Sequence, residues 1–135
     1  MILPLKDLSP RRSYPLVNTL LIAANVLVFL YQFTLPERAF KTFLLSHATV
    51  PARFPAWLGG HIPLEAALWP LFTSMFVHAG LTHLAGNMLF LWVFGDHVED
   101  SYGHLAYLLF YLLCGIGSEL FHVFFSWSST VPAIA

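Results

Sequence analysis

The chain has 135 residues, which is enough for one compact domain and too few to suggest two. Hydrophobic residues make up 58% of it and charged residues only 10%, against roughly 25% charged in an ordinary soluble domain, so the composition is that of a membrane protein. The net charge of −1 excludes a basic nucleic-acid-binding surface, and a single cysteine, Cys114, excludes a disulfide or an all-cysteine zinc site within one chain. We interpret Cys114 as a small hydrophobe in helix packing.

The first predicted span covers residues 15–35. Asp, Glu, Lys and Arg are absent from Ser13 to Pro36, a stretch longer than the roughly 20 residues that cross a bilayer as a helix. Three basic residues precede this span, at Lys6, Arg11 and Arg12. Because basic residues close to the first span usually set the orientation, we expect a cytoplasmic N-terminus in a multi-pass protein of the plasma (inner) membrane.

Residues 36–70 are predicted to form a loop embedded in the membrane interface. Prolines at 51, 55 and 63 break any long helix there. Apolar residues nevertheless recur at i, i+3, i+4 spacing in two places, at Phe40, Phe43 and Leu44 and at Phe54, Trp57 and Leu58. This spacing indicates short amphipathic helices in the headgroup zone.

Two further spans are predicted, at residues 81–95 and 104–125, separated by a polar turn from Asp96 to Gly103. Pro70 and the polar residues that follow it argue against one straight helix from Ala66 onward. Fifteen residues of helix reach only about 22 Å, so the second span should begin below the membrane surface. The expected fold is an all-α membrane protein with three transmembrane helices.

His83 and Asn87 place two hydrogen-bond donors on one face of the second span. They are i and i+4, one helical turn apart, near the positive end of the helix dipole. Donors aimed at one point in this setting suit the stabilisation of an oxyanion. Two alternatives remain at this stage: hydrogen bonds that join helices, and a histidine-bound haem or metal. In an unbroken helix His78 would lie about 140° from His83 and would not share its face.

The third span and the tail after it contain polar residues that could form an ion pair or act as a nucleophile. Glu119 and His122, at i and i+3, are predicted to pair and so neutralise a costly charge. Ser118 is followed by Glu119, and three further serines lie in a polar tail without a neighbouring glycine, at Ser126, Ser128 and Ser129. None of these serines is expected to act as a nucleophile.

The segment TSMFVHAGLTHLAGNMLFLWVFGDHVEDSYG resembles the second transmembrane helix and following turn of the rhomboid family of intramembrane serine proteases. The matching pattern is His-x4-His-x3-Asn followed by Gly-x3-Glu-x3-Gly, at His78, His83, Asn87, Gly95, Glu99 and Gly103. From Tyr14 onward the chain is similar to the N-terminal half of that family's six-helix core. One departure is that Pro70 follows Trp69, where the family often has arginine.

The resemblance implies roles for these residues. His83 and Asn87 match the residues that bind the oxyanion of the tetrahedral intermediate, and His78 matches a residue that braces the loop before the second helix. Glu99, with Gly95 and Gly103 on either side, matches a structural motif of the turn. No cofactor or metal is implied.

The family's nucleophile and base do not occur in this sequence. Rhomboids carry the serine in Gly-x-Ser-Gly on the fourth helix and the base histidine on the sixth, and the 135 residues contain no Gly-x-Ser-Gly. We therefore expect residues 1–135 to be a truncated rhomboid-like transmembrane domain, inactive alone, whose partners are membrane lipid, the missing C-terminal half of the core and a transmembrane substrate helix. The alternative is a non-catalytic rhomboid-like module that binds a helix of another membrane protein.

Overall fold

The computed structural model describes residues 13–134, which are helical apart from turns, loops and an isolated β-bridge between Thr49 and Ala133. The elements in chain order are α1 (Leu16–Thr34), α2 (Glu37–His47), α3 (Arg53–Leu58), α4 (Leu64–Thr73), the 3₁₀-helix η1 (Ser74–Phe76), α5 (Leu81–Phe90), the π-helix η2 (Leu91–Gly95), α6 (Asp96–Tyr102) and α7 (His104–Phe125). The basic residues on which the predicted orientation depends, Lys6, Arg11 and Arg12, lie outside the described residues.

Two helices, α1 and α7, are each long and apolar enough to cross a membrane. The pair Leu64–Phe76 and Leu81–Tyr102 is bent by 80° and gives a third candidate span if it is taken as one broken span. The all-helical membrane fold expected from the sequence is confirmed. Helix α1 lies inside the expected range 15–35, and α7 coincides with the expected range 104–125.

The second span is longer than the sequence suggested. Helices α5, η2 and α6 follow one another without a break from Leu81 to Tyr102, and 22 helical residues reach about 33 Å. The polar segment that begins at Asp96 is therefore helix, and the predicted turn is confined to Gly103, which adopts φ +85°. A span of this length does not need to begin below the membrane surface, as was predicted for one of 15 residues.

The predicted interfacial loop contains three helices. Both apolar triads fall within helices, one in α2 and the other in α3, so the helical spacing read from the sequence is confirmed. Pro36 and Pro63 immediately precede α2 and α4, where a proline is compatible with the start of a helix. Pro70 lies inside α4, and the chain then bends before α5, as its position predicted.

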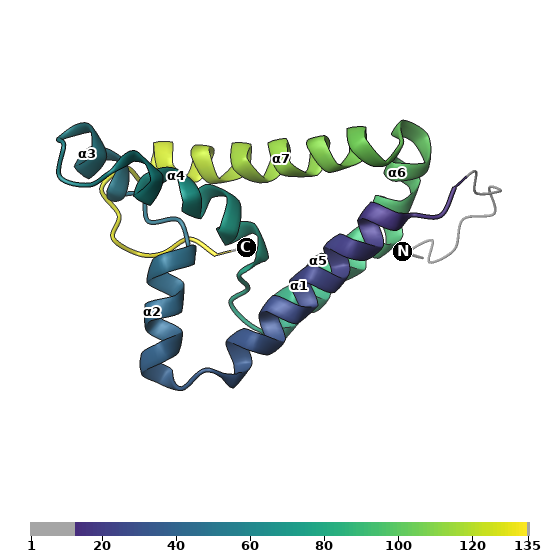
Figure 1. The fold of residues 1–135 in the computed structure, drawn as a ribbon, viewed down its shortest axis with the longest axis horizontal. Helices are drawn as coiled ribbons and strands as arrows, with labels where there is room; N and C mark the ends of the chain where they lie inside the picture. Colours follow the sequence, from purple (N-terminus) through teal and green to yellow (C-terminus); the bar gives the residue numbers. More distant parts are fainter. Residues whose placement is uncertain (1–12, 135) are drawn as a thin grey trace.

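The helices meet at wide angles. Figure 1 shows α1 and α5 side by side, whereas α7 leaves from the end of α6 and crosses at a wide angle to reach α4. The C-terminal segment that follows α7, drawn in yellow, turns back toward α4. This arrangement places the start of α5 opposite the second half of α7.

The buried face of α1 is polar. Three of its four buried residues are Asn18, Asn25 and Gln32, whereas large apolar residues such as Leu27 and Phe33 are exposed. Lipid is as apolar as leucine, so apolar side chains can face it without cost, and polar side chains between helices supply hydrogen bonds. The pattern fits a helix that packs in a membrane through its polar face.

Candidate active site

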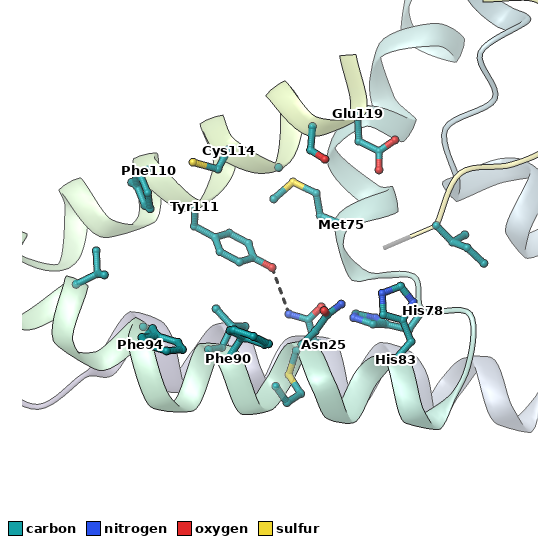
Figure 2. A pocket seen from close by; sticks show the side chains of 18 of the residues that line it. Asn25, Met75, His78, His83, Phe90, Phe94, Phe110, Tyr111, Cys114 and Glu119 are labelled. Atoms are coloured by element: carbon teal, nitrogen blue, oxygen red, sulfur yellow. Dashed lines mark hydrogen bonds between the residues drawn. The ribbon is translucent and has the colours of Figure 1, made fainter. Parts of the chain in front are cut away.

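A cavity of about 720 Å³ lies between α5 and α7, and its lining includes His78, His83 and Asn87. Figure 2 shows His78 and His83 close together at one end of this cavity. Their ring centroids are 5.9 Å apart and the rings meet edge to face, with an interplanar angle of 75°. The three polar residues singled out from the sequence therefore meet at one cavity.

His83 and Asn87 are free to bind a ligand. They occupy the first two turns of α5, His83 is exposed and Asn87 is partly exposed. Within residues 13–134, neither side chain forms a hydrogen bond with another residue. Two unengaged amide and imidazole groups on one helical face can together donate to one negatively charged oxygen.

His78 reaches the cavity because the helix is broken before α5. Its side chain is only 1% exposed, and its Nδ1 lies 3.3 Å from the carbonyl oxygen of Phe76. The 140° separation from His83 that was predicted for an unbroken helix does not apply, since residues 77–80 are not helical. The break turns the His78 ring toward His83.

Gln32 holds the backbone at His78. The His78 N–H donates to Oε1 of Gln32 at 3.1 Å, and Nε2 of Gln32 donates to the His78 carbonyl at 2.7 Å. One side chain of α1 thus satisfies both backbone groups of a buried loop residue, which would otherwise be costly at this depth. The sequence analysis missed Gln32, although a glutamine inside a charge-free span is the signal that could have found it.

Glu99 caps the first turn of α1 from a distant part of the chain. Its carboxylate is fully buried and accepts the backbone N–H groups of Val17 at 2.8 Å and Asn18 at 2.7 Å. It also contacts the ring of His104. Pro15 provides no side-chain cap for α1, so Glu99 satisfies donors that every helix leaves open at its N-terminus.

Gly95 permits close contact between η2, α1 and α7. A Cβ atom at this position would lie 2.3 Å from Oδ1 of Asn18 and 2.5 Å from the Tyr107 hydroxyl. The Tyr107 hydroxyl donates to Oδ1 of Asn18 at 2.8 Å, and Nδ2 of Asn18 donates to the Leu91 carbonyl at 2.8 Å. This carbonyl belongs to the π-helix, whose widened turn alters the regular backbone ladder. Asn18 and Tyr107 were not found from the sequence.

The family model for the rhomboid domain matches residues 65–134, just over half of the chain. The chain belongs to the rhomboid family. It is thereby an integral membrane protein, and the resemblance seen in its second span is confirmed at the level of the family.

The relatives of this rhomboid chain include proteases and a protein described as inactive. It is 32% identical to rhomboid protease AarA of Providencia stuartii over 79% of its own length and 36% of that protein's. It is 31% identical to Rhomboid-like protein 11, chloroplastic, of Arabidopsis thaliana over 74% of its length and 30% of that protein's. With Inactive RHOMBOID-like protein 8 of Arabidopsis thaliana it shares 38% identity over 50% of its length and 19% of that protein's. The chain thus spans about a third or less of each, and no solved structure matches it closely.

On the opposite wall of the rhomboid cavity, Glu119 does not pair with His122 as predicted. No ion pair joins them among the described residues. The Glu119 carboxylate is instead hydrogen-bonded to the hydroxyls of Thr49 and Ser74, which are both fully buried. Those hydroxyls bring the segment between α2 and α3, and η1, against α7. This placement could not be predicted from the spacing of Glu119 and His122.

Cys114 also lines the cavity and is exposed among the described residues, whereas we interpreted it from the sequence as a small hydrophobe in helix packing. Ser118 lines the same wall one turn further along α7. Within residues 13–134, no group of three or more histidine, cysteine or acidic side chains is placed to hold a metal ion.

Proposed function

We propose that this chain supplies the oxyanion-binding face of a rhomboid-type intramembrane serine endopeptidase. His83 and Asn87 donate to the oxygen of the tetrahedral intermediate that forms when a serine attacks a peptide bond in or near a substrate's transmembrane helix. The serine and the base histidine come from polypeptide outside these 135 residues, since the sequence contains no Gly-x-Ser-Gly. The membrane we propose is the plasma (inner) membrane.

One observation carries this proposal. His83 and Asn87 lie on one face of α5, line the same cavity, and have no hydrogen-bond partner within the described residues. Donors that join helices within residues 13–134 would be engaged with another of these helices. Donors that stabilise a transition state must instead be preorganised and unoccupied in the free protein.

His78 and Gln32 support the two donors in this mechanism. The paired hydrogen bonds of Gln32 fix the backbone of the loop that precedes α5, and the His78 ring packs edge to face against His83. The position of the imidazole is then set before substrate arrives. Preorganisation of this kind makes a hydrogen bond effective in the transition state because no reorganisation is needed at that moment.

The test is turnover of a transmembrane substrate in proteoliposomes, with the 135 residues combined with the polypeptide that carries the serine. We expect His83→Ala and Asn87→Ala each to lower kcat by about 10² to 10³ with little change in KM. Thr82→Ala is the matched control, since Thr82 lies on the same helix but does not line the cavity. Unchanged kcat in both cavity variants would contradict the proposal, and the 135 residues alone should form no adduct with a fluorophosphonate.

A second candidate is a non-catalytic module that holds a helix of another membrane protein. It is favoured by the similarity to a protein described as inactive and by the absence of Gly-x-Ser-Gly from the sequence. A photocrosslinker placed at Ser118, in the cavity wall, would then recover a membrane protein in native membranes. A failure to crosslink any membrane protein from this position would count against it.

A further inference from the structure

Two buried oxygen atoms lack a hydrogen-bond donor within residues 13–134, and both belong to residues that line the cavity. They are Oδ1 of Asn25, on α1, and Oε2 of Glu119, on α7. Figure 2 shows the two side chains directed into the cavity from different walls. Asn25 is 0% exposed, and its Nδ2 is already used, donating to the Leu21 carbonyl at 2.8 Å and to the Tyr111 hydroxyl at 3.5 Å.

Buried acceptors without a donor are rare in native proteins, and each one needs a physical explanation. Elsewhere in the molecule a buried loop residue is fully hydrogen-bonded, since Gln32 satisfies both backbone groups of His78. That both orphaned acceptors line one cavity indicates that the occupant of the cavity supplies the missing donors. The cavity thus offers free donors at His83 and free acceptors on its other walls.

Among residues 13–134, Glu119 is the only acidic residue in the lining of this cavity. Hydrogen bonds from the Thr49 and Ser74 hydroxyls hold its carboxylate in place, and the two hydroxyls are themselves 3.2 Å apart. The carboxylate is therefore fixed in position while one oxygen remains available. Thr49 is also joined by an isolated β-bridge to Ala133, which with Ile134 contributes to the cavity wall.

A carboxylate with a free oxygen in a membrane protein suits one kind of polypeptide group especially well. Most backbone N–H groups of a membrane helix are paired within the helix, and only those of its first turn are open. The same chain already uses a carboxylate in this way, because Glu99 accepts the N–H groups of Val17 and Asn18 at the start of α1.

We propose that Glu119 caps the N-terminal turn of the membrane helix that enters this cavity. The proposal rests on the proposed function, which needs another polypeptide segment to bring the nucleophile to the cavity. Asn25 accepts a donor from a more distant part of the same helix. The contact with Glu119 sets how deeply the helix enters and so positions its first turn relative to His83 and Asn87.

The test is association of two coexpressed polypeptides, residues 1–135 and the nucleophile-bearing half of the core, measured by copurification from membranes at matched expression. Loss of a charge-assisted cap should lower association about ten- to hundredfold in Glu119→Leu. Glu119→Gln keeps a neutral acceptor and the side-chain size, so the loss should be smaller. Leu113→Ala, a change at an exposed site on α7 outside the cavity, is the matched control and should leave association unchanged.

A second measurement separates docking from folding and from catalysis. Unfolding of residues 1–135 alone should be nearly unchanged in Glu119→Gln, because its amide oxygen can still accept from the Thr49 and Ser74 hydroxyls. His83→Ala should reduce turnover without reducing association. Association that is the same in wild type, Glu119→Gln and Glu119→Leu would overturn the capping role while leaving the proposed function intact. Loss of association in the Glu119 variants, together with no effect of His83→Ala on turnover, would support the cap and remove the proposed function.

Discussion

The carboxylate of Glu99 is predicted to be a main determinant of stability, because it connects α6 to the start of α1. Replacing it in Glu99→Gln keeps the shape of the side chain but removes the charge and one of the two oxygens that accept the Val17 and Asn18 N–H groups. Hydrogen bonds to a charged group contribute about 1.5 to 3 kcal/mol each, and a buried donor left without a partner costs about 1 to 3 kcal/mol. We therefore expect the free energy of unfolding to fall by about 2 to 4 kcal/mol.

The assay is reversible unfolding of the purified chain in mixed micelles, followed by circular dichroism as the denaturing detergent is increased. Glu37→Gln is the matched control, since Glu37 is exposed in the first turn of α2 and has no hydrogen bond or ion pair within residues 13–134. It should lower the free energy of unfolding by less than about 1 kcal/mol. If Glu99→Gln destabilises the chain no more than Glu37→Gln does, the carboxylate is not the cap of α1 and the reasoning is refuted.

Three other predictions concern packing and access. Gly95→Ala should lower the free energy of unfolding by about 1 to 3 kcal/mol in the same assay, because a Cβ atom there would lie 2.3 Å from an α1 side-chain oxygen. Gly86→Ala is the control and should be neutral or stabilising, because its Cβ atom would meet nothing within 4 Å. Equal effects of the two substitutions would refute the close packing at Gly95. Gln32→Leu should speed hydrogen exchange at the His78 amide by about tenfold or more, since that N–H loses its acceptor. Unchanged exchange, measured by mass spectrometry, would show that Gln32 does not hold the His78 backbone. Cys114 is exposed in the cavity, so N-ethylmaleimide should label its thiol in the folded chain. Labelling should be slower once a further helix is bound. Protection of Cys114 from labelling in the chain alone would contradict an open cavity.

The spans and the short helices between residues 36 and 70 were within reach of the sequence. Their signals are local: a charge-free run long enough to cross a bilayer, and apolar residues at helical spacing between prolines. The pairing of His83 with Asn87 was also predictable, since i and i+4 positions share a helix face whatever the rest of the fold does. Each of these inferences needs only a few neighbouring residues.

The features that failed depend on contacts between distant parts of the chain. The segment after Asp96 has the composition of a turn, yet it is helical because Glu99 points inward to cap α1 and Gly103 provides the positive φ at which the helix ends. His78 joins His83 only because the chain breaks before α5. Glu119 takes its partners from segments 45 and 70 residues earlier, so its neighbour three positions on was a poor guide.

The polar residues of α1 were the most informative signal left unused. An asparagine or glutamine in a charge-free span must be satisfied by protein or face water. Asn18 and Gln32 are both satisfied by contacts with the segments that carry or precede the predicted site. These two buried amides therefore indicated which segments pack against α1 beside the predicted site.

Oxyanion binding by His83 and Asn87 is tested by comparing substrate turnover with the affinity of a reversible peptide aldehyde, which forms a tetrahedral oxyanion on the active serine. If His83 and Asn87 bind that oxyanion, His83→Ala, Asn87→Ala and the double variant should lose aldehyde affinity in proportion to their loss in kcat/KM, because both quantities report binding of the transition state. The Thr82→Ala control should change neither. Variants that lose turnover but bind the aldehyde as tightly as the unmodified protein would show that His83 and Asn87 do not hold the oxyanion.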